Sequence, residues 1–170
     1  MDTMEAIRTR RSIRKFTDRP VEHELVMELI EAAMYAPSAG NEQPWQFLVI
    51  NDRAILDEVP HINPNAAMAR DASVAILVCG DLTLEKFQGF WVQDCSAAAQ
   101  NLLLAAHAKG LGAVWTGIHP MEDRVEKMRN LLGLPDHIIP LALIPVGYPN
   151  KEAAPESRFK KDRIRFNKWE

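Results

Sequence analysis

Apolar residues recur along the chain at two different spacings, which predict helices in some segments and strands in others. Residues 18–36 carry an amphipathic pattern with helical spacing, and Pro37 ends the predicted helix. The apolar positions of this helix are Leu25, Val26, Leu29, Ile30, Ala33 and Met34. The segment 90–109 is apolar over much of its circumference, so we expect a long helix at the domain centre or against a partner. Asp2 and Glu5 resemble a capping box that opens a short first helix.

Short apolar runs bounded by turn residues predict four strands, at 45–50, 73–81, 113–116 and 138–146. Within the last of these, Pro140 and Pro145 indicate an edge strand or mark its ends. Two further helices are expected at 53–59 and 122–132, and the segment 61–71 reads as a loop with a turn of helix. The last twenty residues are basic and poor in core material, although 163–169 alternates like an exposed strand. These elements predict a single α+β domain over 1–170, with a tail at about 150–170.

Composition narrows the class of protein. The chain has 170 residues, of which 47% are hydrophobic and 25% charged, as is ordinary for one globular domain. A net charge of -3 argues against a nucleic-acid platform that neutralises phosphates. No apolar run approaches the ~18 residues of a membrane span, and the acidic start does not resemble a signal peptide. We therefore expect a cytoplasmic protein that binds neither nucleic acid nor membrane.

Cysteine and histidine usage gives little support to disulfides or metals. Cys79 lies in an apolar run and Cys95 in an alanine-rich helical stretch, so both are expected to be buried hydrophobic residues. The five histidines form no metal-binding pair such as HxxxH. We expect no metal site.

A basic motif near the start, RRSIR, has two interpretations. It comprises Arg10, Arg11, Ser12 and Arg14. These residues could form a solvated helix end, where arginines favour the C-terminal dipole. They could equally clamp an anion, because guanidinium groups hold phosphate in a bidentate manner and a serine hydroxyl adds a donor. The motif alone leaves both interpretations open.

Three later segments carry further candidate chemistry. The turn PSAGNEQPW is either a rigid helix-to-strand connection or a surface where Ser38 and Asn41 offer hydrogen bonds to a polar ring or sugar alcohol. The segment GLGAVWTG can be explained as a helix cap followed by a buried strand, although this explanation accounts less well for Thr116 and Gly117. Alternatively, Gly117 could let a ligand approach the backbone closely. The basic tail is either a solvated face or a source of Arg158 for the anion of Arg10 and Arg14.

Taken in order, these motifs resemble the FMN-dependent nitroreductase family, in its compact branch. RRSIRKF, PSAGNEQPWQF, GLGAVWTG, PVGYP and the basic tail cover nearly the whole chain, and PS-x-x-N-x-QPW is the most diagnostic. The resemblance implies a nitroreductase-like α+β fold with a central, mainly antiparallel sheet flanked by helices. It also implies an intertwined homodimer with FMN at each end of the interface, in which the C-terminal segment is exchanged with the partner subunit.

The resemblance assigns roles to particular residues. Arg10, Ser12 and Arg14 would hold the FMN phosphate, with Arg11 beside them and Arg158 joining from the tail. Pro37, Ser38, Ala39 and Asn41 would line the isoalloxazine and ribityl chain from the partner subunit, whereas Gln43 would brace the turn. Trp115, Thr116 and Gly117 would lie along the other edge of the flavin. This chain departs from the family pattern at Met68, where larger members have a lysine. Asn65 and Arg70 are the nearby residues that could substitute for that lysine.

The activity that the resemblance implies is a ping-pong oxidoreductase, a cytoplasmic flavoprotein. NAD(P)H would reduce FMN, and an electron-poor acceptor such as a nitroaromatic or quinone would then take the hydride. No protein acid or base is expected. Two alternatives remain: a flavin-binding dimer without NAD(P)H-driven turnover, and a divergent member that uses flavin or a halogenated aromatic as its substrate.

Overall fold

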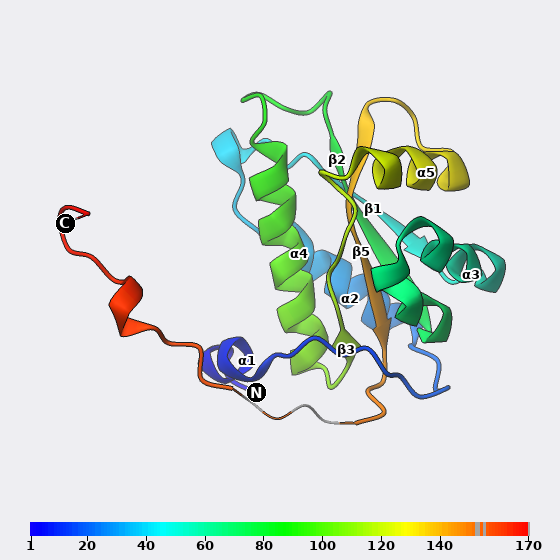
Figure 1. Cartoon of the computed structure of the whole chain (residues 1–170), viewed down its shortest axis with the longest axis horizontal. Helices are drawn as coiled ribbons and strands as arrows, with labels where there is room; N and C mark the ends of the chain where they lie inside the picture. Colours follow the sequence, from blue (N-terminus) through cyan, green and yellow to red (C-terminus); the bar gives the residue numbers. More distant parts are fainter. Residues whose placement is uncertain (152–153, 155, 170) are drawn as a thin grey trace.

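The computed structural model describes residues 1–151, 154 and 156–169. A five-stranded antiparallel sheet forms its centre, with helices on both faces, as the expected α+β class requires. Figure 1 shows the long helix α4 (Trp91–Ala108) crossing one face, while α3 (Arg53–Ile62) and α5 (Glu122–Leu132) lie on the other. The first helix and the C-terminal tail meet at one end of α4 (Figure 1).

The helices begin and end where local sequence dictates. The side chain of Asp2 accepts a hydrogen bond from the backbone N–H of Glu5 and caps α1 (Thr3–Thr9). The predicted amphipathic helix is α2 (His23–Met34), and Gly133 ends α5 in the left-handed conformation that a C-cap needs. Short 3-10 helices occupy both connecting segments, η1 (Ala39–Asn41) and η2 (Pro64–Asp71).

The sheet has the order β1-β2-β5-β3, with β4 also paired to β5. All pairs are antiparallel. The strand bounds are Trp45–Ile50 for β1, Val74–Asp81 for β2, Gly112–Ala113 for β3, Thr116–Gly117 for β4 and Ile138–Gly147 for β5. The expectation that the prolines indicate an edge strand or mark the ends of the strand is wrong, because β5 lies inside the sheet and extends past both prolines. The register of the β2–β5 pair shifts between Val78 and Cys79, and Pro140 lies at this irregularity as the partner of Cys79. Proline is tolerated inside a sheet at such bulges, where the regular ladder of hydrogen bonds is interrupted.

Pro145 divides the strand expected at 113–116 into two. Ala113 pairs with Val146 and Thr116 pairs with Leu143, so one register continues across the interruption. Val114 therefore stands opposite Pro145, which has no N–H to donate to it. Only the reverse bond forms, from Val114 N to Pro145 O at 3.4 Å. The strand is interrupted where its partner lacks a donor.

Side chains alternate between two cores, one on each face of β2. Val74, Ile76 and Val78 pack with α2 and α4 in the larger core. Ala75, Leu77 and Cys79 pack with α3, η2 and α5 in the smaller one. Because both faces are covered, every residue of β2 is buried and the run is continuously apolar, as its sequence indicated. Both cysteines are buried as expected, and Trp45 is buried as well.

The tail leaves the body of the molecule. Figure 1 shows the C-terminal residues 156–169 passing α1 and then extending away from the sheet and the other helices. Within 156–169 the structure has one short 3-10 helix, η3 (Lys161–Arg163), so the strand expected at 163–169 is wrong for the single chain. A strand needs a neighbour to pair with, and here none lies beside it. Across the described residues, no helix has the length and apolar character needed to span a membrane.

Candidate functional site

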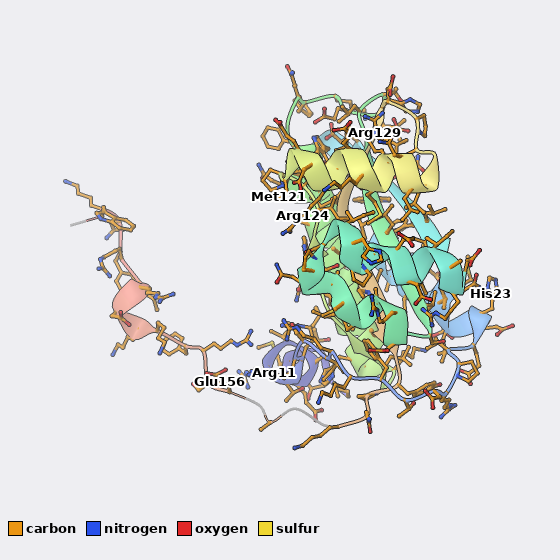
Figure 2. All side chains as sticks on the ribbon, turned by 45° about the vertical axis from the view of Figure 1, so that its right-hand side comes forward. Arg11, His23, Met121, Arg124, Arg129 and Glu156 are labelled. Atoms are coloured by element: carbon orange, nitrogen blue, oxygen red, sulfur yellow. The ribbon has the colours of Figure 1, made fainter. Side chains whose placement is uncertain are left out.

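Arginines from the two ends of the chain converge beside α1. Arg10 is the C-cap residue of α1, and burial lowers its pKa, with the positive charges of Arg158 and Arg11 lowering it further. Arg11 Nη1 lies 3.0 Å from Glu156 Oε2, and Figure 2 shows this pair where the tail passes α1. Arg158 also lines a groove of about 610 Å³ with Ile7 and Thr9. Arg11 is thus paired with Glu156, while Arg10 and Arg158 add positive charge to the cluster.

Ser12 extends this cluster along the sheet. It forms an isolated parallel bridge with Ala113, and Ile13 N donates to Ala113 O at 3.0 Å. Gly112 permits this approach, because a Cβ there would overlap the side chain of Ile13. The backbone pairing fixes the segment that carries the RRSIR motif, while Ser12 itself remains exposed.

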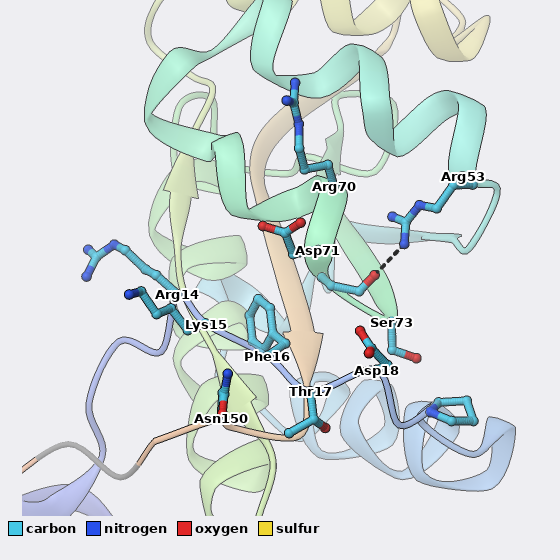
Figure 3. A pocket seen from close by; sticks show the side chains of 12 residues that line it. Arg14, Lys15, Phe16, Thr17, Asp18, Arg53, Arg70, Asp71, Ser73 and Asn150 are labelled. Atoms are coloured by element: carbon cyan, nitrogen blue, oxygen red, sulfur yellow. Dashed lines mark hydrogen bonds between the residues drawn. The ribbon is translucent and has the colours of Figure 1, made fainter.

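Arg14 lies in a different pocket from the arginine cluster. This cavity of about 570 Å³ is also lined by Lys15, Arg53, Arg70 and Asp71. Figure 3 shows Arg14 and Arg53 on opposite sides of this pocket, and Arg53 Nη1 donates to Ala72 O at 2.9 Å. The structure therefore brings Arg10, Arg11 and Arg158 together and places Arg14 at a separate polar surface.

The turn after α2 holds its polar groups by internal hydrogen bonds. Gln43 N donates to Ser38 Oγ at 3.0 Å, and Gln43 Nε2 donates to Asn41 Oδ1 at 3.1 Å. Gln43 thus braces the turn, which confirms the interpretation from sequence. Gly40, Asn41 and Gln43 all have positive φ, a conformation that costs energy for residues other than glycine. Pro37 and Asn41 are exposed, whereas Ser38 and Ala39 are half-buried.

The same turn is anchored to the first turn of α4. Ala39 N donates to Asp94 Oδ1 at 3.0 Å. Asp94 is only 5% exposed. Sequence reasoning missed Asp94, because an acid in the first turn of a helix is ordinary and nothing in the pattern linked it to a turn 55 residues earlier.

Trp115, Thr116 and Gly117 lie beside β5 with different exposure. Thr116 is buried and its hydroxyl donates to Leu143 O at 2.6 Å, whereas Trp115 and Gly117 are half-buried. A Cβ on Gly117 would have no described atom within 4 Å, so the backbone is open to approach on that side. The Gly117 carbonyl accepts hydrogen bonds from Asn63 Nδ2 at 3.3 Å and Arg124 Nη1 at 3.1 Å.

Asn63 is a second residue that sequence reasoning missed. Its side chain is buried; Oδ1 accepts from Asn65 N while Nδ2 reaches Gly117 O, so it joins η2 to β4. An asparagine before a proline reads as an ordinary turn residue, and only the fold reveals the second contact. This link places Asn65 near Gly117, whereas Met68 is half-buried on the same 3-10 helix.

Two groups of the expected site residues, the 38–43 turn and the arginine cluster, lie at opposite ends of α4. Asp94, which binds the 38–43 turn, is in the first turn of this helix. His107, whose Nε2 lies 2.8 Å from Thr9 Oγ1 beside Arg10, is in its last turn. At 1.5 Å of rise per residue, the two anchoring points are about 20 Å apart along the helix. One chain alone does not bring the turn and the arginine cluster together.

Comparisons with known proteins agree on one family. The model of the nitroreductase family matches residues 7–148. A protein of Methanothermobacter thermautotrophicus, provisionally named an NADH dehydrogenase/NAD(P)H nitroreductase, is 54% identical over 169 residues, or 99% of this chain and 88% of its own.

Solved structures share the whole fold. A crystal structure from Parabacteroides distasonis with the same provisional name has a TM-score of 0.95 and 47% identity, and covers 98% of each chain. A provisionally named nitroreductase from Desulfovibrio desulfuricans, solved in complex with FMN, has a TM-score of 0.85 and 34% identity over 100% of this chain and 99% of its own.

Proposed function

The chain belongs to the nitroreductase family, and we propose that it transfers hydride from NAD(P)H through bound FMN to an electron-poor organic acceptor. FMN is the expected cofactor because a structure 34% identical over the whole chain was solved with it. The acceptor class that this proposal names is a nitroaromatic, a quinone or a similar compound. The observation that carries it is the convergence of Arg10 and Arg158 from the two ends of the chain.

The arginine cluster fits the charge of the FMN phosphate. Among the described residues, Arg11 pairs with the carboxylate of Glu156, and Arg10 and Arg158 add two further positive charges. A phosphate monoester carries about −1.5 to −2 at neutral pH, so the cluster and the phosphate nearly neutralise one another. Guanidinium groups also match phosphate geometry better than ammonium groups do. Ser12, exposed on the adjoining segment, is placed to add a hydroxyl donor.

A homodimer would reunite the two halves of the site. In a two-fold dimer with antiparallel α4 helices, the first turn of one helix lies beside the last turn of its partner. The 38–43 turn of one subunit would then reach the arginine cluster of the other, across the separation of about 20 Å that divides them within one chain. On α4, Gln100 is exposed and Ser96 and Ala97 are half-buried, and their small or uncharged side chains permit close helix packing.

The protein's own part in the reaction is to bind and orient. Bound FMN would take hydride from NAD(P)H and release it to the acceptor in a second half-reaction at the same place, which is a ping-pong scheme. The arginines fix the phosphate, the 38–43 turn lines the ring, and Gly117 leaves its edge uncovered. We assign no side chain as proton donor, so the protons come from solvent.

Absorbance spectroscopy tests this proposal. Purified protein should be yellow, and its flavin bands should bleach when NADH or NADPH is added without oxygen. Adding a quinone or nitroaromatic should then restore them. Yellow protein whose bands persist with both nucleotides would be a flavin carrier instead. Protein that stays colourless after incubation with excess FMN would contradict the proposal altogether.

A further inference from the structure

Two buried carboxyl groups face one another beneath the 38–43 turn. Glu42 is 7% exposed and Asp94 is 5% exposed. Glu42 Oε2 accepts backbone hydrogen bonds from Lys86 at 2.6 Å and Phe87 at 3.1 Å. Asp94 Oδ1 accepts the hydrogen bond from Ala39 N at 3.0 Å. One oxygen of each carboxyl group is therefore occupied by backbone donors.

The other two oxygens have no donor of their own. Glu42 Oε1 and Asp94 Oδ2 are buried and find no hydrogen-bond partner among the described residues. The two carboxyl groups lie close enough for each to shift the pKa of the other. Ionised carboxylates are acceptors only, so a hydrogen bond between the two groups requires a proton on one of them. A single proton between the pair would give each of the four oxygens a hydrogen-bond partner.

The surroundings favour placing that proton on Asp94. Burial raises the pKa of Asp94, and the hydrogen bond to Glu42 together with the charges of Glu42 and Glu85 raises it further. Burial opposes ionisation of Glu42 too, but the Lys86 and Phe87 N–H donors, the bond from Asp94 and the Lys86 charge lower its pKa overall. On the core side the neighbouring titratable groups are the buried thiols Cys79 and Cys95, whose pKa values burial raises.

We propose that Glu42 and Asp94 share one proton, and that this carboxyl pair holds the 38–43 turn in the shape that receives the flavin ring. The inference rests on the proposed function, because it takes the turn to line FMN. Gly40, Asn41 and Gln43 have φ values of 52°, 53° and 48°, and a turn of this kind persists only when its surroundings hold it. Asp94 anchors its start through Ala39, while Glu42 joins its end to the loop before α4. Both are positioning residues.

The shared proton makes the turn sensitive to a rise in pH. Because the pKa of Asp94 is raised on folding, its contribution is complete at low pH and is lost as the pH rises through that raised pKa. Two adjacent carboxylates would then repel one another under the turn. The dissociation constant of FMN should therefore rise with pH, even though the arginines remain charged.

Isosteric amides distinguish a shared proton from simple packing. Glu42→Gln and Asp94→Asn each replace the O–H donor with an N–H donor, so either single variant keeps the bond but has no proton to lose. Their FMN dissociation constants, measured by flavin fluorescence on dilution of loaded protein, should become independent of pH over the range in which that of the wild type rises. The double variant sets one amide donor against another, and its dissociation constant should exceed those of both single variants by about tenfold. Glu126→Gln, an exposed acid on α5, should behave as wild type.

Infrared spectroscopy of the flavin-free protein separates this inference from the proposed function. At a pH below the raised pKa of Asp94, the wild type should show the C=O stretch of a protonated buried carboxyl, and each single amide variant should lose it. A band that persists in both variants, or a double variant that binds FMN as tightly as the singles, would overturn the shared proton. If the band behaves as expected but the affinity for FMN is the same in all variants, the turn does not position the flavin and the inference fails. Bleaching by NAD(P)H would still test the proposed function independently.

Discussion

Thr9, the last residue of α1, is hydrogen-bonded to His107 in the last turn of α4, with 2.8 Å between Thr9 Oγ1 and His107 Nε2. The Thr9 hydroxyl donates its own hydrogen to Glu5 O at 2.7 Å. Nε2 of His107 must therefore carry a hydrogen and donate it to Thr9, which assigns the tautomer from the network. This bond fixes α1, and with it Arg10, against the long helix.

The His107 contact predicts a loss of stability in acid. Burial lowers the pKa of His107, and the charge of Arg10 lowers it further. The unfolded chain therefore takes up a proton at higher pH than the folded protein does, so the free energy of unfolding falls as the pH drops through the ordinary range for histidine. His107→Gln should weaken this dependence in melting curves recorded across acidic pH. His23→Gln, an exposed histidine at the start of α2, serves as the control and should follow the wild-type curve.

The separation of Arg14 from the other arginines predicts different ligand dependence. Arg10→Ala and Arg158→Ala should each weaken FMN binding by about 1.5–3 kcal/mol, the value of a charge-assisted hydrogen bond, but leave riboflavin binding unchanged. Arg14 lines a separate pocket, so Arg14→Ala should weaken FMN binding less than either of these changes does. Titration with both flavins, with Lys127→Ala on α5 as a remote control, makes the comparison. A loss of FMN affinity equal to that of Arg10→Ala, with riboflavin binding unchanged, would contradict this and place Arg14 at the phosphate.

Replacing Gly40 should lower the free energy of unfolding through a steric overlap as well as through backbone strain. It has φ of 52°, and a Cβ would overlap the ring of Phe87. Gly133 has φ of 64° with no described atom near a Cβ, so Gly133→Ala should cost only the backbone strain, about 1–2 kcal/mol. Gly40→Ala should cost more than this in urea unfolding, and the excess should disappear in a Phe87→Ala background. Equal costs for the two glycines would show that Phe87 moves aside freely.

Sequence periodicity was sufficient for the main elements and their two-sided packing. The apolar stripe of α2 has the period of a helix with one buried face, and the continuous apolar run of β2 is typical of a strand buried on both faces, so each pattern predicts both the element and its burial. The interruption opposite Pro145 was not predictable, since it depends on which strand pairs with β5 and in which register. Pro145 also led to a wrong prediction for β5, because a proline within a strand is typical of an edge strand or of a strand end.

The site was predictable only in part, for a similar reason. Arg10 and Arg158 are 148 positions apart, and their proximity came from resemblance rather than from any local pattern. In the sequence, Glu42 is an ordinary polar residue of a loop and Asp94 an ordinary acid at the start of a helix. Their proximity is a contact between distant segments, which no periodicity of the sequence predicts. The same holds for Asn63, whose bond to Gly117 depends on η2 lying beside β4.

The exposed tail predicts that a partner subunit covers it. Phe159, Phe166 and Trp169 are 74%, 83% and 85% exposed, and burying such side chains stabilises an interface by about 1.5–3 kcal/mol each. Phe166→Ala with Trp169→Ala should raise the monomer–dimer dissociation constant at least about tenfold, measured by analytical ultracentrifugation. The fluorescence of Trp169 is obtained by subtracting the emission spectrum of the Trp169→Phe variant from that of the wild type. In the flavin-loaded wild type, this emission should be blue-shifted and protected from quenching by acrylamide. Quenching of Trp169 as efficient as that of free tryptophan would show that the tail stays in solvent, and the exchange of C-terminal segments would have to be abandoned.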